Sequence, residues 1–330
     1  IFTTVAALEK GISPFTVINS PPRKEFTGMV GCDGNLLVDG GINPWPVNNS
    51  TSSGNFDMFR GAAYSVNTFF AELEKRAGVC ETVEVARKMG VRYADGGKLG
   101  ELRPGGISAE VASFTLGSTE VSPLTLANAY ATVSAHGVYC KPRSITKLVD
   151  RDGKSLPVPA SKCKQAVTRN AADAAAAVLT NVVDGGIPGR TGGAMSLGRD
   201  TTGKTGTIDN QAAVWFAGST PDLAAAVWVG DPRGGYRYPL RNITINGRYY
   251  PKVFGSSLPG PTWKAAMQGA LKGSDPVPME LKNQWGLGPA RQVGSPGLRP
   301  AVPPSPTVAT PWWQRIPGAG TTDGGSTSTE

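Results

Sequence analysis

Thr202-Gly203-Lys204-Thr205-Gly206-Thr207 is the stretch of sequence that decides the fold, because it fits motifs from two different architectures. Counted from Gly198, the residues match G-x-x-x-x-G-K-[ST], the loop that holds nucleotide phosphates between a buried strand and a helix. Counted from Lys204, they form K-T-G-T, a pattern that would place a lysine and two hydroxyl groups on one strand. The flanking residues must decide between the two.

Neither flank suits a phosphate-binding loop. Residues 185–193, upstream, are rich in glycine and polar, which predicts a loop and not a buried strand. Downstream, residues 212–218 and 223–229 are rich in alanine, valine and tryptophan around a Pro221-Asp222 turn, which predicts two antiparallel strands. Phosphates bind at a helix N-terminus, and no helix is predicted to begin at Thr205. A P-loop NTPase is therefore the least favoured interpretation, and we place Lys204 on an edge strand.

Composition narrows the possible functions. The 330 residues can bury a full-sized core, in one domain or in two. The formal charge of +8 comes from scattered lysines and arginines, so nucleic acid is not predicted as a partner. No apolar run approaches the ~18 residues that a membrane-spanning helix needs. The only histidine is His136 and no C-x-x-C spacing occurs, so we predict no metal and no cofactor.

The four cysteines leave two interpretations open. Cys140 and Cys163 flank a predicted hairpin with its turn at residues 150–153, so they are expected to lie close together. Cys32 and Cys80 would then form the second pair. Two disulfides would indicate an oxidising, extracytoplasmic compartment. Four buried free thiols are the alternative, because free cysteine is among the most buried residue types.

Helical periodicity organises most of the chain. The chain opens inside an apolar helix that ends at Gly11, and further helices are predicted at the ranges 57–64, 68–77, 81–89, 123–136, 170–184 and 261–271. Asn170 is expected to cap the fifth of these six helices. We interpret His136 as a surface or capping residue at the end of its helix, and not as a catalytic base. From Lys272 onward prolines recur and the end is rich in glycine, serine and threonine, so we predict a domain over 1–271 and a flexible tail over 272–330.

The available residues favour lysine-assisted chemistry. With one peripheral histidine, a Ser-His-Asp triad is hard to build, and burial can lower the pKa of a lysine until it acts as a base. Lys204 with the hydroxyls of Thr205 and Thr207 would receive a substrate carboxylate. The polar break formed by Ser65-Val66-Asn67 between two apolar helices could complete a cleft. The alternatives are a helix cap for Ser65 and a solvated edge-strand lysine for Lys204.

Together these stretches resemble the penicillin-binding protein and serine β-lactamase superfamily. Ser65-Val66-Asn67 resembles its S-x-N motif, and Lys204-Thr205-Gly206-Thr207 resembles its K-T-G-T motif. Residues 117–139 and 215–221 are similar to class A penicillin-binding proteins, and the resemblance covers roughly residues 1–271. The cysteines, long loops and proline-rich tail are similar to actinobacterial, in particular mycobacterial, members.

The resemblance implies an α+β fold, with an antiparallel sheet flanked by helices, a helical subdomain and an active site between them. It implies D,D-transpeptidation of peptidoglycan stem peptides through an acyl-serine intermediate, with β-lactams as inhibitors. Ser65 would relay protons, Asn67 would bind the substrate backbone, and Lys204 would shape the electric field. The segment 205–207, Thr205, Gly206 and Thr207, would bind the substrate and its terminal carboxylate. The parent protein would be anchored to the plasma membrane, outside the cytoplasm, with an upstream glycosyltransferase domain and with cell-wall assembly proteins as partners of the tail.

One motif of the family is not present in this sequence. The nucleophilic serine of the family lies in S-x-x-K, directly before residues similar to Ile1-Phe2-Thr3. We therefore expect the nucleophile and its lysine upstream of residue 1, and we expect this chain alone to be inactive and not acylated by penicillin. A β-lactamase is disfavoured because no E-x-x-L-N stretch lies between Ser65 and Lys204. A non-enzymatic sensor or scaffold on the same fold is the other alternative.

Overall fold

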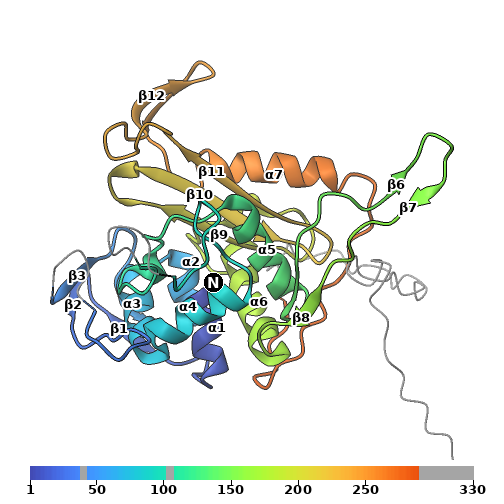
Figure 1. Ribbon diagram of the computed structural model, residues 1–330. Helices are drawn as coiled ribbons and strands as arrows, with labels where there is room; N and C mark the ends of the chain where they lie inside the picture. The colour runs from blue at the N-terminus through green and yellow to red at the C-terminus, as the bar shows by residue number, and fades with distance from the viewer. Residues whose placement is uncertain (38–42, 102–107, 290–330) are drawn as a thin grey trace, which may run out of the picture.

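A three-stranded antiparallel sheet with helices on both faces forms one half of the molecule, and a group of helices forms the other (Figure 1). The computed structural model describes residues 1–37, 43–101 and 108–289. Helices and antiparallel strands together confirm the predicted α+β class.

The central sheet contains β9 (Thr202–Thr207), β10 (Ala213–Ser219) and β11 (Ala224–Gly230), in the order β11-β10-β9. Lys204 pairs with Ala217 in this register, so it lies within the edge strand, as predicted. The strand is followed by the short 3-10 helix η3 (Asp209–Gln211). No long helix begins at Thr205, so the nucleotide-loop interpretation does not hold.

The two faces of the sheet are covered by different helices. On one face, α7 (Pro259–Ala270) places the fully buried Trp263 against Phe216, with ring centroids 4.8 Å apart. The Trp263 indole also donates to the carbonyl of Ala225. On the other face lie α5 (Pro123–Ser134) and α6 (Arg169–Val183) (Figure 1). The sheet is therefore the middle layer of three.

The helical half contains α1 (Phe2–Glu9), α2 (Met58–Tyr64), α3 (Asn67–Ala77) and α4 (Val79–Lys88). Residues 3–8 of α1 are all buried, including the polar Thr3 and Thr4, so the helix is enclosed on more sides than the one apolar face predicted from the sequence. The alanine-rich α6 packs against α1 and α2 as well as β9, so it joins the two halves. Its N-cap is Thr168, whose hydroxyl accepts from the amide of Ala171. The prediction that Asn170 caps this helix is therefore wrong.

Short two-stranded ribbons extend from this body. They are β1 (Ile18–Ser20) with β4 (Gly54–Phe56), β2 (Arg23–Phe26) with β3 (Trp45–Asn48), β5 (Val138–Cys140) with β8 (Cys163–Gln165), β6 (Leu148–Val149) with β7 (Ser155–Leu156), and β12 (Arg241–Ile245) with β13 (Arg248–Lys252). Two further 3-10 turns are η1 (Phe114–Leu116) and η2 (Gly193–Met195).

Both disulfides join cysteines that the sequence predicts to be paired. Cys140 and Cys163 are directly opposite each other on β5 and β8 and form one disulfide, and Cys32 and Cys80 form the other. None of the four is a free thiol. The alternative of four buried thiols is therefore wrong.

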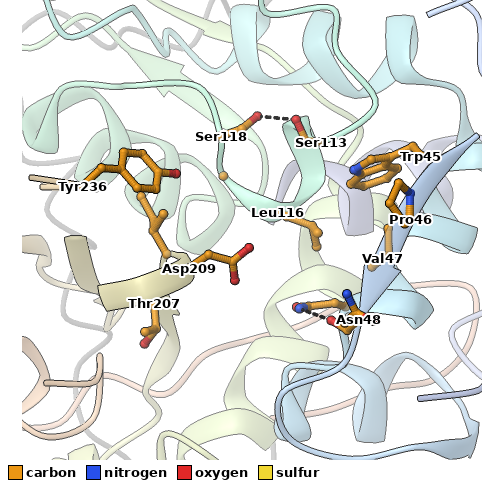
Figure 2. Close-up of a pocket in the computed structure, with 13 residues that line it drawn as sticks. Trp45, Pro46, Val47, Asn48, Ser113, Leu116, Ser118, Thr207, Asp209 and Tyr236 are labelled. Atoms are coloured by element: carbon orange, nitrogen blue, oxygen red, sulfur yellow. Dashed lines mark hydrogen bonds between the residues drawn. The ribbon is translucent and has the colours of Figure 1, made fainter. Parts of the chain in front are cut away.

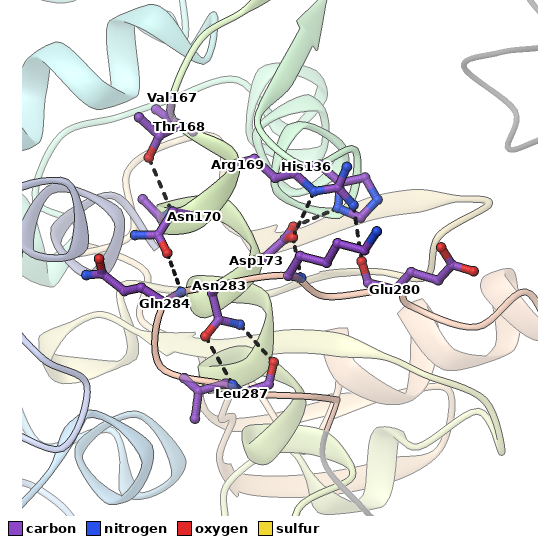
Figure 3. Close-up of polar contacts among 12 residues, drawn as sticks. His136, Val167, Thr168, Arg169, Asn170, Asp173, Glu280, Asn283, Gln284 and Leu287 are labelled. Atoms are coloured by element: carbon purple, nitrogen blue, oxygen red, sulfur yellow. Dashed lines mark hydrogen bonds and ion pairs between the residues drawn. The ribbon is translucent and has the colours of Figure 1, made fainter.

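The packed part of the chain extends beyond residue 271, where the sequence places the end of the domain. Met279 is buried, and the amides of Lys282 and Gln284 donate to the side chains of Asp173 and Asn170 on α6 (Figure 3). The segment 279–287 is therefore docked on α6, because its backbone amides find partners although its composition favours no core. The rest of the predicted tail, residues 290–330, lies outside the described residues.

His136 follows the last turn of α5 and has neither of its predicted roles. Its Nδ1 lies 2.6 Å from Oδ1 of Asp173, a carboxylate that is fully buried (Figure 3). The same carboxylate accepts from Nε of Arg169 at 3.2 Å. His136 is therefore part of the polar cluster that holds α5, α6 and the docked segment together.

Membrane-spanning helices and metal-binding clusters are both absent from residues 1–37, 43–101 and 108–289. Within these ranges, no helix has the length and apolar character required to cross a membrane. The same ranges contain no group of three or more histidine, cysteine, aspartate or glutamate side chains that could hold a metal ion.

Candidate active site

Ser65 ends α2 in a left-handed conformation, with φ 56° and ψ 52°. Few residues other than glycine adopt this geometry, and it turns the chain sharply between α2 and α3. The next residue, Val66, is fully buried, so its packing in the core holds the turn between α2 and α3 in place. At Gly61, an added Cβ would lie 2.5 Å from the ring of Phe69, so α2 and α3 can pack this closely only with glycine there.

Lys204 connects the two motifs. Its Nζ donates to Oγ of Ser65 at 2.7 Å, across 139 residues of sequence, and to the carbonyl of Thr205 at 3.0 Å. Burial lowers the pKa of Lys204 from 10.5 to about 8. The pKa of the lysine is therefore close to neutral pH, as a proton-transferring group requires.

Thr191 is a site residue that the sequence does not reveal. Its amide and its hydroxyl both donate to the carbonyl of Ala63 in α2, and its hydroxyl oxygen accepts from Oγ1 of Thr205 at 3.1 Å. Thr191 therefore bridges the helix that carries Ser65 and the strand that carries Lys204. Only its position in a glycine-rich loop was visible in the sequence, which gave no functional signal.

Asn67 and Thr207 line a pocket of about 260 Å³ beside the Ser65–Lys204 pair (Figure 2). Asn67 begins α3, and its Nδ2 donates to the carbonyl of Asn48 on β3 at 2.8 Å. The amide group is thereby oriented, and its oxygen remains available to a ligand. Oγ1 of Thr207 accepts from the amide of Gly255 at 3.1 Å, so its own proton is free to be donated.

Gly206 lies between the two threonines and pairs with Trp215 of β10. A Cβ added to Gly255 would lie 2.8 Å from the Gly206 carbonyl, so the loop before α7 approaches the strand closely at this point. The structure thus brings Ser65 and Lys204 into direct contact and places Asn67 and Thr207 on a common pocket. Thr205 is linked to α2 through Thr191.

The model of the penicillin binding protein transpeptidase domain matches residues 1–241 of the chain. The chain belongs to this family. Penicillin-binding protein 1A of Mycolicibacterium smegmatis is 31% identical over 96% of the chain, and that of Mycobacterium tuberculosis is 30% identical over 96%. The chain is thus a transpeptidase domain of the class A penicillin-binding protein type, as the motifs suggested.

Solved structures of the family share this fold. The penicillin-binding protein PonA1 from Mycobacterium tuberculosis superposes with a TM-score of 0.65 at 28% identity, covering 94% of this chain and 75% of that one. A structure of PonA1 in complex with penicillin V gives a TM-score of 0.61 at 26% identity, with 90% and 73% covered. The chain spans 39% and 37% of the two curated relatives, so it corresponds to less than half of each.

Proposed function

We propose that this domain carries out D,D-transpeptidation of peptidoglycan stem peptides through an acyl-serine intermediate. The observation that carries the proposal is the 2.7 Å hydrogen bond from Lys204 Nζ to Ser65 Oγ, which unites the S-x-N and K-T-G-T motifs at one point. Because Ser65 accepts from Lys204, its own hydroxyl proton can be donated to a leaving amine. The lysine then returns a proton to Ser65, for which a pKa of about 8 is suitable.

The remaining site residues have binding roles in this proposal. Asn67 presents its amide oxygen to an N–H of the substrate backbone, because its NH₂ group is held by Asn48. Thr207 donates its free hydroxyl proton to the terminal carboxylate, while Thr205 stays bound to Thr191. Hydrogen bonds to a carboxylate are stronger than neutral ones, so the hydroxyl of Thr207 would favour a peptide with a free C-terminus.

In this proposal the nucleophilic serine and its lysine are supplied by residues that precede Ile1 in the parent protein. The support is positional, because Ile1 packs against the cluster that contains Ala217, and Ala217 pairs with Lys204 in the central sheet. The two disulfides support a location outside the cytoplasm.

Labelling by fluorescent penicillin tests the proposal. The chain and a version extended upstream through S-x-x-K are incubated with the reagent, and the mass of each intact protein is measured. We expect an adduct only on the extended chain, and no adduct when the motif serine of that extension is replaced by alanine. Absence of labelling on an extension that contains S-x-x-K would favour a sensor or scaffold, and labelling of residues 1–330 alone would show that the nucleophile lies within this sequence.

A further inference from the structure

The pocket beside the Ser65–Lys204 pair has an aspartate, Asp209, in its described lining. Of the described residues that line it, only Asp209 is charged, although the chain as a whole has a formal charge of +8. Asp209 begins η3, two residues after Thr207, and it is exposed to solvent. Its carboxylate points into the space between Tyr236 and Trp45 (Figure 2). This is a negative site within a positively charged domain.

Within the described part of the chain, no other side chain binds the carboxylate of Asp209. Among residues 1–37, 43–101 and 108–289, no side-chain hydrogen bond or ion pair involves Asp209. Arg241, from β12, contacts this turn by donating to Oδ1 of Asn210 at 2.6 Å. The neighbouring cation is therefore bound to Asn210, and the carboxylate is available to a ligand.

The other walls of the pocket suit an alkyl chain that ends in an amine. Leu116 and Trp45 offer apolar surface, and the rings of Trp45 and Tyr236 can attract a cation through their faces. A volume of about 260 Å³ holds one extended side chain together with a short length of backbone. Asn67 and Thr207, which the proposed function assigns to the substrate peptide, lie on the same pocket.

We propose that Asp209 binds a primary ammonium group on the side chain of a stem peptide, and so selects peptides that carry a free amine. The inference rests on the proposed function for the identity of the peptide, but not for the charge that is recognised. The amine can belong to the donor peptide, whose backbone contacts Asn67, or to the acceptor peptide that attacks the acyl-enzyme. Both have the same chemistry at neutral pH.

Binding to the unextended chain tests the recognition without any acylation. The probes are Nα-acetyl-lysyl-D-alanyl-D-alanine, which has a free ε-amine, and the same peptide acetylated also at the ε-amine. Partly exposed ion pairs are weak, so we expect a preference of about two- to fivefold for the free amine in an NMR titration. The preference should decrease as salt is added.

Variants at position 209 make the test specific. Asp209→Asn should abolish the preference, and Asp209→Lys should reverse it in favour of the acetylated peptide. Asp152→Asn, in the exposed β6–β7 turn, removes the same charge far from the pocket and should leave the preference unchanged. A preference that persists in Asp209→Asn, or that is absent in the unsubstituted chain, would overturn the proposal.

The extended chain separates the two sources of the amine. If the donor carries it, Asp209→Asn slows acylation by the free-amine peptide two- to fivefold, with no effect on the rate at which an added amine consumes the acyl-enzyme. If the acceptor carries it, the opposite pattern is expected. Penicillin V has no amine, so its labelling of Asp209→Asn should match that of the unsubstituted protein. Loss of penicillin labelling in both would contradict the proposed function and leave the NMR result valid.

Discussion

Lys204 should make the stability of this domain rise with pH, and a single substitution should remove that rise. The pKa of Lys204 falls from 10.5 to about 8 on folding, because the charged form is buried. Below pH 8 the lysine is protonated in both states, and the folded state bears the full cost of burying the charge. Between pH 8 and 10.5 the folded lysine becomes neutral while the unfolded one stays charged, so this cost disappears as pH rises.

The magnitude follows from the two pKa values. Each unit of difference corresponds to about 1.4 kcal/mol, so complete removal of the charge is worth at most about 3.5 kcal/mol. Only part of this range is accessible, and from pH 7 to pH 9.5 the expected gain in the free energy of unfolding is at most about 2 kcal/mol. In the variant Lys204→Met, the methionine side chain cannot titrate, so the variant should lack this gain in the free energy of unfolding.

Urea denaturation at several values between pH 7 and pH 9.5 measures the effect. The informative quantity is the difference in unfolding free energy between the unsubstituted chain and Lys204→Met, because other titrating groups cancel from it. Lys154→Met, at an exposed position in the β6–β7 turn, is the matched control and should follow the unsubstituted chain. A difference for Lys204→Met that stays constant to within about 0.5 kcal/mol over this range would refute a buried, proton-releasing lysine.

Three further predictions test the fold around the site. Ser65→Gly should be more stable than Ser65→Ala by about 1 kcal/mol, because only glycine adopts φ 56° without cost; the opposite order in urea denaturation would contradict the left-handed geometry. Gly218→Ala should lose about 2 kcal/mol or more in thermal unfolding, since its Cβ would lie 2.3 Å from the carbonyl of Thr202, whereas Gly269→Ala, which meets nothing within 4 Å, should lose nothing. Asp173→Asn should cost about 2 to 3 kcal/mol and speed hydrogen exchange in residues 279–287, and unchanged exchange there would show that this carboxylate does not hold the segment.

Local signals predicted the parts of the fold that local interactions determine. Asp57 and Gly78 mark the limits of α2 and α3, and the two apolar runs around the Pro221-Asp222 turn predicted β10 and β11. The same reasoning failed where two equivalent caps compete. Thr168 and Asn170 are both good cap residues, but Asn170 is bound to the amide of Gln284, 114 residues away, and Thr168 caps the helix instead.

Contacts between distant segments account for what the sequence could not reveal at the site. S-x-N and K-T-G-T could be matched to a family, so Ser65 and Lys204 were found without knowledge of their 2.7 Å contact. Thr191 has no motif, and its role arises from a contact with Ala63 that crosses 128 residues. The docked segment 279–287 is held largely by backbone amides, and every residue except proline has one, so composition carries no sign of it.

Two energetically costly features of the domain lie in contact with each other. Ser65 is in a conformation that costs about 1 to 2 kcal/mol for a residue with a Cβ, and Lys204 bears a charge in a site that lowers its pKa to about 8. Neither geometry would persist alone, since rotation of Ser65 or withdrawal of Lys204 into solvent would relieve it. The buried Val66 and the bridge through Thr191 oppose those movements from either side. Strain that is concentrated in two hydrogen-bonded groups and maintained by their neighbours is expected at a functional site, where the geometry serves the chemistry at a cost in stability.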